Sequence, residues 1–153
     1  MRYILLPLIL TSMLMTTKAE ALKNNYSPEL NCLALNIYFE SRGESSLGQK
    51  AVAWVTINRV NDPEYPDTIC DVVHDHRQFS WVLDKKSNTP KDKKAWNRAV
   101  YIAWFVLNNR HIYEDPTDGA VMFHTVNSKP SWRKAYIPTT KIDGHIFYKK
   151  GDI

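Results

Sequence analysis

Apolar residues recur every three or four positions in three segments of the chain, and this spacing predicts three amphipathic helices. The predicted helices cover residues 27–43, 45–60 and 89–109. Each segment opens with a residue that suits a helix N-cap, and Ser27-Pro28 and Thr89-Pro90 also place proline at the first helical position. The hydrophobic pattern therefore indicates a mostly helical chain.

A different pattern follows the third helix. The turn-forming residues 115–119 lead into two segments, 120–126 and 141–148, in which β-branched and aromatic residues partly alternate with polar ones. We expect these segments to form a small two-stranded ribbon, separated by a loop over residues 127–140. With a short helix from Asp67 or Thr68 to Val73, the expected fold is a single α+β domain that is mostly α.

The first residues have the pattern of a secretory signal peptide. Arg2 precedes an apolar run from Tyr3 to Met15, and Ala19-Glu20-Ala21 offers small residues where a signal peptidase reads. The run is too short for a membrane span of about 20 residues. We expect residues 1–21 to be removed and 22–153 to act outside the cytoplasm, in the periplasm, in the cell wall or as a secreted protein. A retained membrane anchor or a buried helix is the alternative.

The composition narrows the class of protein further. The chain of 153 residues is 44% hydrophobic and 24% charged, which excludes a disordered chain. Its net charge of +4 is modest and its lysines are scattered among acids, so a nucleic-acid partner is not expected. The two cysteines, Cys32 and Cys70, are expected to form a disulfide in an oxidising compartment. Two buried free thiols are the alternative.

Glu40 is the first candidate for catalysis. It ends an apolar helix directly after Ile37-Tyr38-Phe39, where neighbouring aromatic rings would remove water from its carboxyl group. Desolvation raises the pKa of a carboxyl, and a protonated carboxyl near neutral pH is what a general acid needs. The alternative is a solvated surface glutamate, paired with Arg42.

The histidines and aromatic residues supply further candidates. His74-x-His76 with a distant histidine could bind zinc, but the spacing matches no common motif, so we expect no metal. His124 and His145 lie on the predicted ribbon and could face a cleft. The group Gln78-Phe79-Ser80-Trp81, together with Trp132 and Tyr148, combines aromatic faces with polar groups, as sugar-binding clefts do. Ordinary core packing is the alternative for each aromatic residue.

Taken in order, these motifs resemble the SleB-type cell wall hydrolases, named for the spore cortex-lytic enzyme. The resemblance covers residues 30–150, opens with the run CLALNIYFESRGE from Cys32 to Glu44, and continues through Gly48-Gln49-x-Ala51-Val52-Ala53, Asn58-Arg59-Val60, the run from Tyr65 to Val73, Gln78-Phe79-Ser80-Trp81, Gly119-Ala120-x-x-Phe123-His124, Pro130-x-Trp132 and Gly144-His145-x-Phe147-Tyr148. The departures are small: Ser41 stands where alanine is common in the family, and Phe39 where a polar residue or histidine is often found.

The resemblance implies a lysozyme-like domain, of the goose-lysozyme or lytic-transglycosylase type. Such a domain would cut peptidoglycan glycan strands between N-acetylmuramic acid and N-acetylglucosamine without a metal or other cofactor. It implies that Glu40 is the catalytic acid and that Glu44 binds substrate or, alternatively, holds the turn or the next helix start. The residues that it places along the glycan cleft are Gln78, Ser80 and Trp81, with His124 and Tyr148 on the ribbon side.

The chemistry of the candidates favours one reaction within this class. Hydrolysis of a glycosidic bond normally uses two carboxyls about 5–9.5 Å apart, and the sequence offers no clear second carboxyl. A single glutamate suffices for a lytic transglycosylase, so we favour that activity over a muramidase. The alternatives are a zinc N-acetylmuramoyl-L-alanine amidase that uses some of the five histidines and a non-catalytic peptidoglycan-binding module. The protein is expected to be a monomer without stable membrane insertion.

Overall fold

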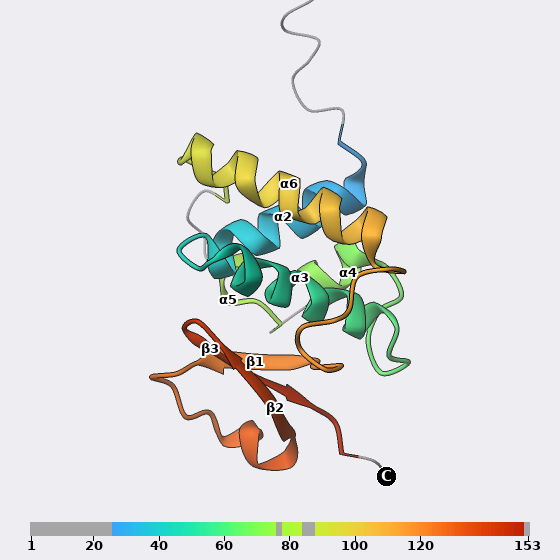
Figure 1. The fold of residues 1–153 in the computed structure, drawn as a ribbon, viewed down its shortest axis with the longest axis vertical. Coiled ribbons are helices and arrows are strands. Elements are labelled where there is room, and N and C mark those ends of the chain that lie inside the picture. Colours follow the sequence, from blue (N-terminus) through green and yellow to red (C-terminus); the bar gives the residue numbers. More distant parts are fainter. Residues whose placement is uncertain (1–25, 76–77, 84–87, 152–153) are drawn as a thin grey trace, which may run out of the picture.

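The computed structural model describes residues 26–75, 78–83 and 88–151, so the expected signal peptide at 1–21 lies outside the described residues. Helices form one part of the molecule and a small sheet forms the other (Figure 1). The helices are α2 (Pro28–Ser41), α3 (Ser46–Val60), α4 (Ile69–His74), α5 (Ser80–Leu83) and α6 (Lys93–Asn109). Within these described ranges, no helix is both long enough and apolar enough to span a membrane.

Side-chain caps begin the helices close to where the sequence predicts. Ser27 accepts a hydrogen bond from the backbone N–H of Leu30 before α2, and Ser45 accepts one from Gly48 before α3. Thr68 caps α4 in the same way. These three helix starts are confirmed, and α2 and α3 end at or near the predicted residues.

The predicted start of the third long helix is wrong by three residues. Its cap is Asp92, whose carboxylate accepts a hydrogen bond from the N–H of Ala95, and not Thr89. The backbone N–H groups of Lys91 and Asp92 donate to the hydroxyl of Tyr38 on α2. This tertiary contact holds the segment before α6 against α2, and it outweighs the local Thr-Pro signal.

Helix α2 is the centre of the helical part. It packs against α3, α4 and α6. The side chains of Leu33 and Ile37 on α2 are fully buried, together with Ile57 and Ile102 from its neighbours. The disulfide between Cys32 and Cys70, with a Cα–Cα distance of 5.3 Å, joins α2 to α4 and confirms the predicted pairing.

The sheet has three strands, so the predicted two-stranded ribbon is wrong in this respect. Strands β1 (Met122–Thr125), β2 (Ile137–Ile142) and β3 (His145–Lys149) are antiparallel in the order β1-β3-β2. A turn at Asp143-Gly144 divides the segment that was expected to be one strand, and Asp143 has a left-handed φ of 49°. Asp-Gly is a strong hairpin signal. A 3₁₀ helix, η1 (Ser131–Ala135), lies between β1 and β2.

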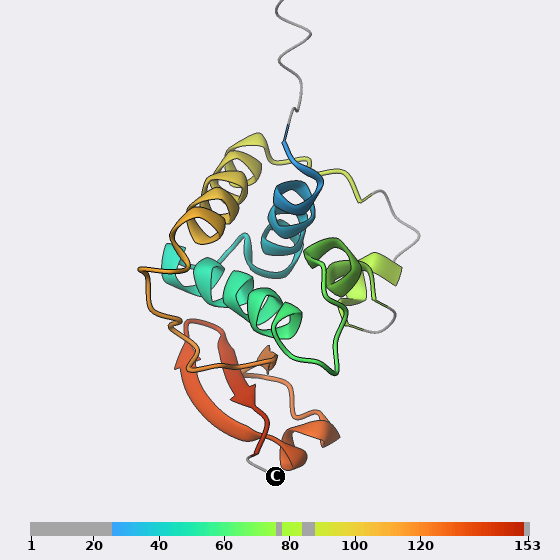
Figure 2. The same ribbon diagram turned by 90° about the vertical axis from the view of Figure 1, so that its right-hand side faces the viewer.

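Helix α3 connects the sheet to the other helices. Figure 2 shows α3 between the sheet and the remaining long helices. Ala51 and Val55, on the side of α3 that packs against the sheet, form a small second core with Ala120, Ile142 and Phe147. Because this core fixes the sheet on one face of α3, the end of α2, the end of α3 and strand β1 converge at one place.

Candidate active site

A cavity of about 410 Å³ lies where the helices meet the sheet. Its lining residues come from α2, α3, α5, β1 and η1 and from the turn before α5; they are Glu40, Arg59, Gln78, Ser80, Leu83, Met122, Phe123 and Trp132. Hereafter this cavity is called the cleft. It combines one carboxyl, one guanidinium, two smaller polar groups and a wall of apolar and aromatic side chains.

Glu40 lies in the last turn of α2 and is the only carboxyl among the described residues that line the cleft. Burial raises the pKa of Glu40 to about 7, and the positive charge of Arg59 opposes this shift. The alternative partner, Arg42, instead holds its guanidinium 5.2 Å from the ring centroid of Tyr38. The environment of Glu40 is therefore that of a general acid at neutral pH.

Arg59 belongs to the family-like motif Asn58-Arg59-Val60 and was not predicted to be a site residue, yet its side chain is buried at the edge of the cleft. Its Nε donates a hydrogen bond of 2.7 Å to the carbonyl of Val121. In the described structure its Nη1 is buried without a hydrogen-bond partner. Its guanidinium also lies 5.0 Å from the ring centroid of Phe79. The fold thus holds a positive charge near Glu40 that is only partly satisfied by protein groups.

Gln78 and Ser80 line the cleft together with Glu40, as the resemblance implies. The side-chain amide of Gln78 donates a hydrogen bond of 3.2 Å to Asp75, which fixes its orientation. Ser80 is exposed at the first position of α5. Both side chains can offer hydrogen bonds to a ligand in the cleft.

Trp81 lies in the core and not along the cleft. Its indole N–H donates a hydrogen bond of 3.2 Å to Asn36, and its ring stacks on Phe39 with centroids 4.7 Å apart. Because Phe39 precedes Glu40, Trp81 supports the end of α2. The indole that lines the cleft is Trp132 on η1.

His124 and Tyr148 are buried together beneath Trp132. The Nε2 of His124 lies 2.9 Å from the hydroxyl of Tyr148, and the two rings are stacked. Trp132 packs edge-to-face with both rings, with centroid distances of 5.7 and 5.5 Å. In this structure the pair supports the wall of the cleft and is not among its lining residues.

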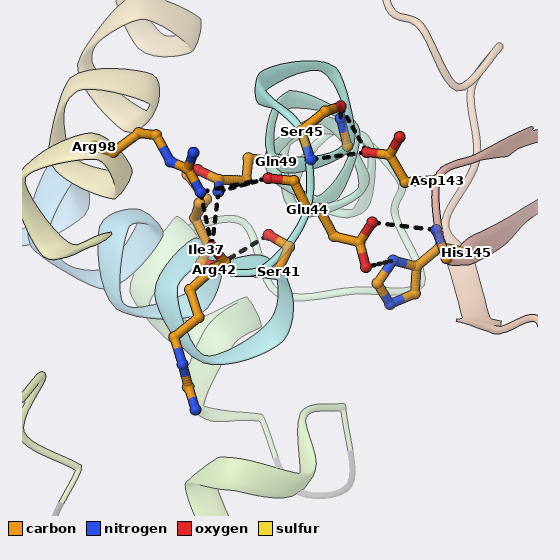
Figure 3. A network of polar contacts seen from close by, with 11 residues as sticks. Ile37, Ser41, Arg42, Glu44, Ser45, Gln49, Arg98, Asp143 and His145 are labelled. Atoms are coloured by element: carbon orange, nitrogen blue, oxygen red, sulfur yellow. Dashed lines mark hydrogen bonds and ion pairs between the residues drawn. The ribbon is translucent and has the colours of Figure 1, made fainter. Parts of the chain in front are cut away.

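Glu44 joins the link between α2 and α3 to the β2–β3 turn (Figure 3), and it is not among the residues that line the cleft. Its carboxylate accepts a hydrogen bond of 3.1 Å from the N–H of Gly144 and lies 3.8 Å from Nδ1 of His145. In return, the carboxylate of Asp143 accepts hydrogen bonds from the N–H and hydroxyl of Ser45. These contacts of Glu44 and Asp143 join the β2–β3 turn to the beginning of α3.

The histidines of the described segments do not assemble a metal site. His74 and His111 are exposed, whereas His124 and His145 are buried in the sheet; His76 lies outside the described residues. Within those segments, no three or more histidine, cysteine or acidic side chains are grouped so that they could hold a metal ion.

Comparisons with known proteins agree on one family. The Cell Wall Hydrolase family model matches residues 43–148, beginning just after Glu40. A spore cortex-lytic enzyme of Bacillus cereus is 36% identical over 136 residues, covering 86% of this chain and 49% of the relative. One of Halalkalibacterium halodurans is 34% identical over 134 residues, covering 85% of this chain and 38% of the relative. The chain thus spans half or less of the length of these two curated relatives.

Solved structures show the same fold. The catalytic domain of the germination-specific lytic transglycosylase SleB from Bacillus anthracis matches with a TM-score of 0.65 and 34% identity, over 82% of this chain and 98% of that chain. The catalytic domain of Bacillus cereus SleB matches with a TM-score of 0.61 and 30% identity, over 82% and 94%. These matches confirm the predicted mostly helical, lysozyme-like α+β fold, and the chain belongs to the cell wall hydrolase family.

Proposed function

We propose that this protein cuts the glycan strands of peptidoglycan as a lytic transglycosylase, with Glu40 as both acid and base. The observation that carries the proposal is the place of Glu40: it is the single carboxyl among the described lining residues of the cleft, and burial raises its pKa to about 7. Such a group is protonated often enough near neutral pH to donate a proton, and basic enough to take one back.

The reaction follows from this one group. Protonated Glu40 donates its proton to the glycosidic oxygen between N-acetylmuramic acid and N-acetylglucosamine, and the bond from that oxygen to C1 of the muramoyl residue breaks. The carbonyl of the muramoyl N-acetyl group stabilises the positive charge that develops at C1. The Glu40 carboxylate then removes the proton of the C6 hydroxyl as O6 bonds to C1. The product carries a 1,6-anhydro end, no water is consumed, and Glu40 is protonated again.

Four other residues of the cleft suit this reaction. The charge of Arg59 favours the carboxylate form that exists halfway through the reaction, after the first proton has been given away. Trp132 offers an aromatic face on which the apolar face of a sugar ring can lie, and Gln78 and Ser80 can bind its hydroxyl groups. The site thus has groups for both chemistry and sugar binding.

Cleavage by water, as in a muramidase, is the second form of the same activity. It normally uses a second carboxyl about 5–9.5 Å from the first. Because Glu40 has no such partner among the described cleft residues, attack by the C6 hydroxyl of the substrate is the better match.

We further propose that residues 1–21 are a signal peptide and that residues 22–153 form the catalytic domain, which acts as a monomer. The support is the charged, apolar and small-residue pattern of that segment. Peptidoglycan lies outside the cytoplasmic membrane, so an enzyme that cuts it must be exported. Action in the periplasm, in the wall or after secretion would each satisfy this requirement.

The test is mass spectrometry of the products from purified peptidoglycan, with the Glu40→Gln protein in parallel. We expect muropeptides that end in 1,6-anhydromuramic acid, and none from the variant. Reducing muramic acid ends would instead identify a muramidase. Free stem peptides would identify an amidase, and binding without any product from either protein would identify a non-catalytic module.

A further inference from the structure

A second cavity, of about 310 Å³, lies where the end of α2 meets the beginning of α6. Its lining residues are Arg42, Asp92, Lys94, Ala95 and Arg98, and none of them lines the cleft that holds Glu40. Three of its five residues carry a positive charge and one carries a negative charge. We call this cavity the basic pocket.

The positive charges of the basic pocket outnumber its single negative charge. The carboxylate of Asp92 supplies one negative charge against the three positive ones, and one of its oxygens accepts the capping hydrogen bond from the N–H of Ala95. No ion pair within residues 26–75, 78–83 and 88–151 involves Arg42, Lys94 or Arg98. A cavity with an excess of positive charge attracts anions.

Two of the three cations are also held in place. The Nη2 of Arg98 donates hydrogen bonds to the backbone carbonyls of Arg42, at 2.7 Å, and Glu44, at 3.4 Å. The guanidinium of Arg42 lies over the ring of Tyr38, and Figure 3 shows its side chain pointing away from Glu44 and His145. Pre-positioned guanidinium groups bind planar anions with a smaller loss of side-chain entropy.

The basic pocket and the cleft lie at the same end of α2 but on different sides of it. Arg42 follows Glu40 by two positions, and residues two apart on a helix point about 200° apart. A sugar ring bound next to Glu40 therefore does not reach the pocket itself. Only a flexible substituent of the strand, extending around the helix end, would connect the two cavities.

We propose that the basic pocket binds carboxylate groups of the peptide stem on a muramoyl residue of the substrate, an inference that rests on the proposed function. The lactyl carboxyl of the muramoyl residue is bound to the stem as an amide, so the negative charges of a peptidoglycan strand lie on the stem and not on the sugars. Arginine recognises carboxylates through paired hydrogen bonds, and Arg42 and Arg98 supply them here. The pocket thereby selects strands whose stems are still attached.

The first experiment compares two substrates, peptidoglycan strands with intact stems and strands from which an amidase has removed the stems. The variant is Arg42→Gln/Lys94→Gln. The control, Lys93→Gln/Arg110→Gln, also removes two positive charges, but from exposed residues outside the pocket: the first residue of α6 and its C-cap. We expect the ratio of kcat/KM on intact over stem-free strands to fall about tenfold in the variant, mainly through KM, because one or two charge-assisted hydrogen bonds are lost.

The outcomes of this comparison are distinct. A ratio that stays at the parent value in the variant, or that falls equally in the control, would overturn the proposal. Lys94→Gln alone changes one exposed side chain and serves as a second variant if the double variant does not fold. A smaller fall in the same ratio is then expected, and no fall would count against the pocket.

A binding experiment separates failure of this proposal from failure of the proposed function. Glu40→Gln protein is titrated by calorimetry with the free stem tetrapeptide and, separately, with a glycerol phosphate oligomer. We expect the tetrapeptide to bind and Arg42→Gln/Lys94→Gln in the same background to weaken its Kd about tenfold. This result does not depend on whether the parent cuts glycan strands. Binding of the phosphate oligomer alone would overturn the assignment to the stem.

Discussion

Glu44 accepts a hydrogen bond of 3.1 Å from the backbone N–H of Gly144, one hundred residues further along the chain. The contact is reciprocal, because Asp143, next to Gly144, accepts hydrogen bonds from the N–H and hydroxyl of Ser45, next to Glu44. There is little spare room: a Cβ added at Gly144 would lie 2.9 Å from a carboxylate oxygen of Glu44. These reciprocal hydrogen bonds therefore fix the β2–β3 turn against the start of α3.

We expect Glu44→Ala to act mainly on stability. It leaves the half-buried N–H of Gly144 without its acceptor, and losing such a bond costs about 1–2 kcal/mol in the free energy of unfolding. The measurement is urea denaturation together with KM for peptidoglycan strands. Glu114→Ala, at an exposed glutamate, is the matched control. A large rise in KM with unchanged stability would contradict this role and restore Glu44 as a substrate-binding residue.

Trp81 and Trp132 have different roles in the structure: Trp81 packs in the core, and Trp132 lines the cleft. Trp81 is buried against Phe39, so we expect Trp81→Ala to lower the free energy of unfolding by about 3–5 kcal/mol. Trp132 is only partly buried and lines the cleft, so Trp132→Ala should raise KM with a smaller loss of stability. Thermal denaturation and kinetics of both variants test this. The opposite assignment of the two effects would place Trp81 in the cleft.

These tryptophans also show where sequence reasoning stops. Local patterns predict the helices well, because N-caps and apolar spacing act within a few residues, as at Ser27 and Thr68. Which of two tryptophans faces a cleft depends instead on contacts between distant segments. Trp81 finds the amide of Asn36, forty-five residues away, and no local pattern reports that pairing.

The surroundings of Glu40 also combine features that local sequence predicts with features that only contacts between distant segments determine. That Glu40 ends an apolar helix beside aromatic residues is visible in the sequence, and the raised pKa follows from it. The role of Arg59 is not visible, because its charge reaches the cleft only after the sheet has packed on α3 and Val121 has accepted its Nε–H. The third strand differs from the prediction for a more local reason: residues 137–140 of β2 fall in the expected loop, and the turn at Asp143-Gly144 falls inside the expected strand 141–148.

The raised pKa of Glu40 predicts how stability depends on pH. Because its pKa is about 7 in the folded protein and 4.5 ordinarily, the protonated form favours folding. This contribution is complete below pH 4.5 and is lost as the pH rises through 7. We expect the parent to lose up to about 3 kcal/mol of unfolding free energy relative to Glu40→Gln over this range. Urea denaturation of both proteins at several pH values measures it, and parallel pH profiles would contradict the shift.

The disulfide between Cys32 and Cys70 predicts a dependence on redox conditions. It closes a loop with a sequence separation of 38 residues and joins α2 to α4. Restricting a loop of this length in the unfolded chain stabilises the folded state by about 3–4 kcal/mol. We expect a reducing agent to lower the Tm of the parent, and not that of a Cys32→Ala/Cys70→Ala variant. An equal Tm with and without reductant in the parent would argue against this stabilisation.

The charge of Arg59 predicts the alkaline limit of activity. Cleavage begins with protonated Glu40, so kcat/KM should fall as the pH rises through about 7. The positive charge of Arg59 lowers the pKa of Glu40. Arg59→Gln removes that charge, so we expect the pKa to rise and the falling limb of the pH profile to move to higher pH. Arg59→Lys keeps the charge and should hold the limb near its parent position. The pH at which kcat/KM falls does not depend on how much rate either variant loses. If that pH stays the same or becomes lower in Arg59→Gln, Arg59 does not control the protonation of Glu40.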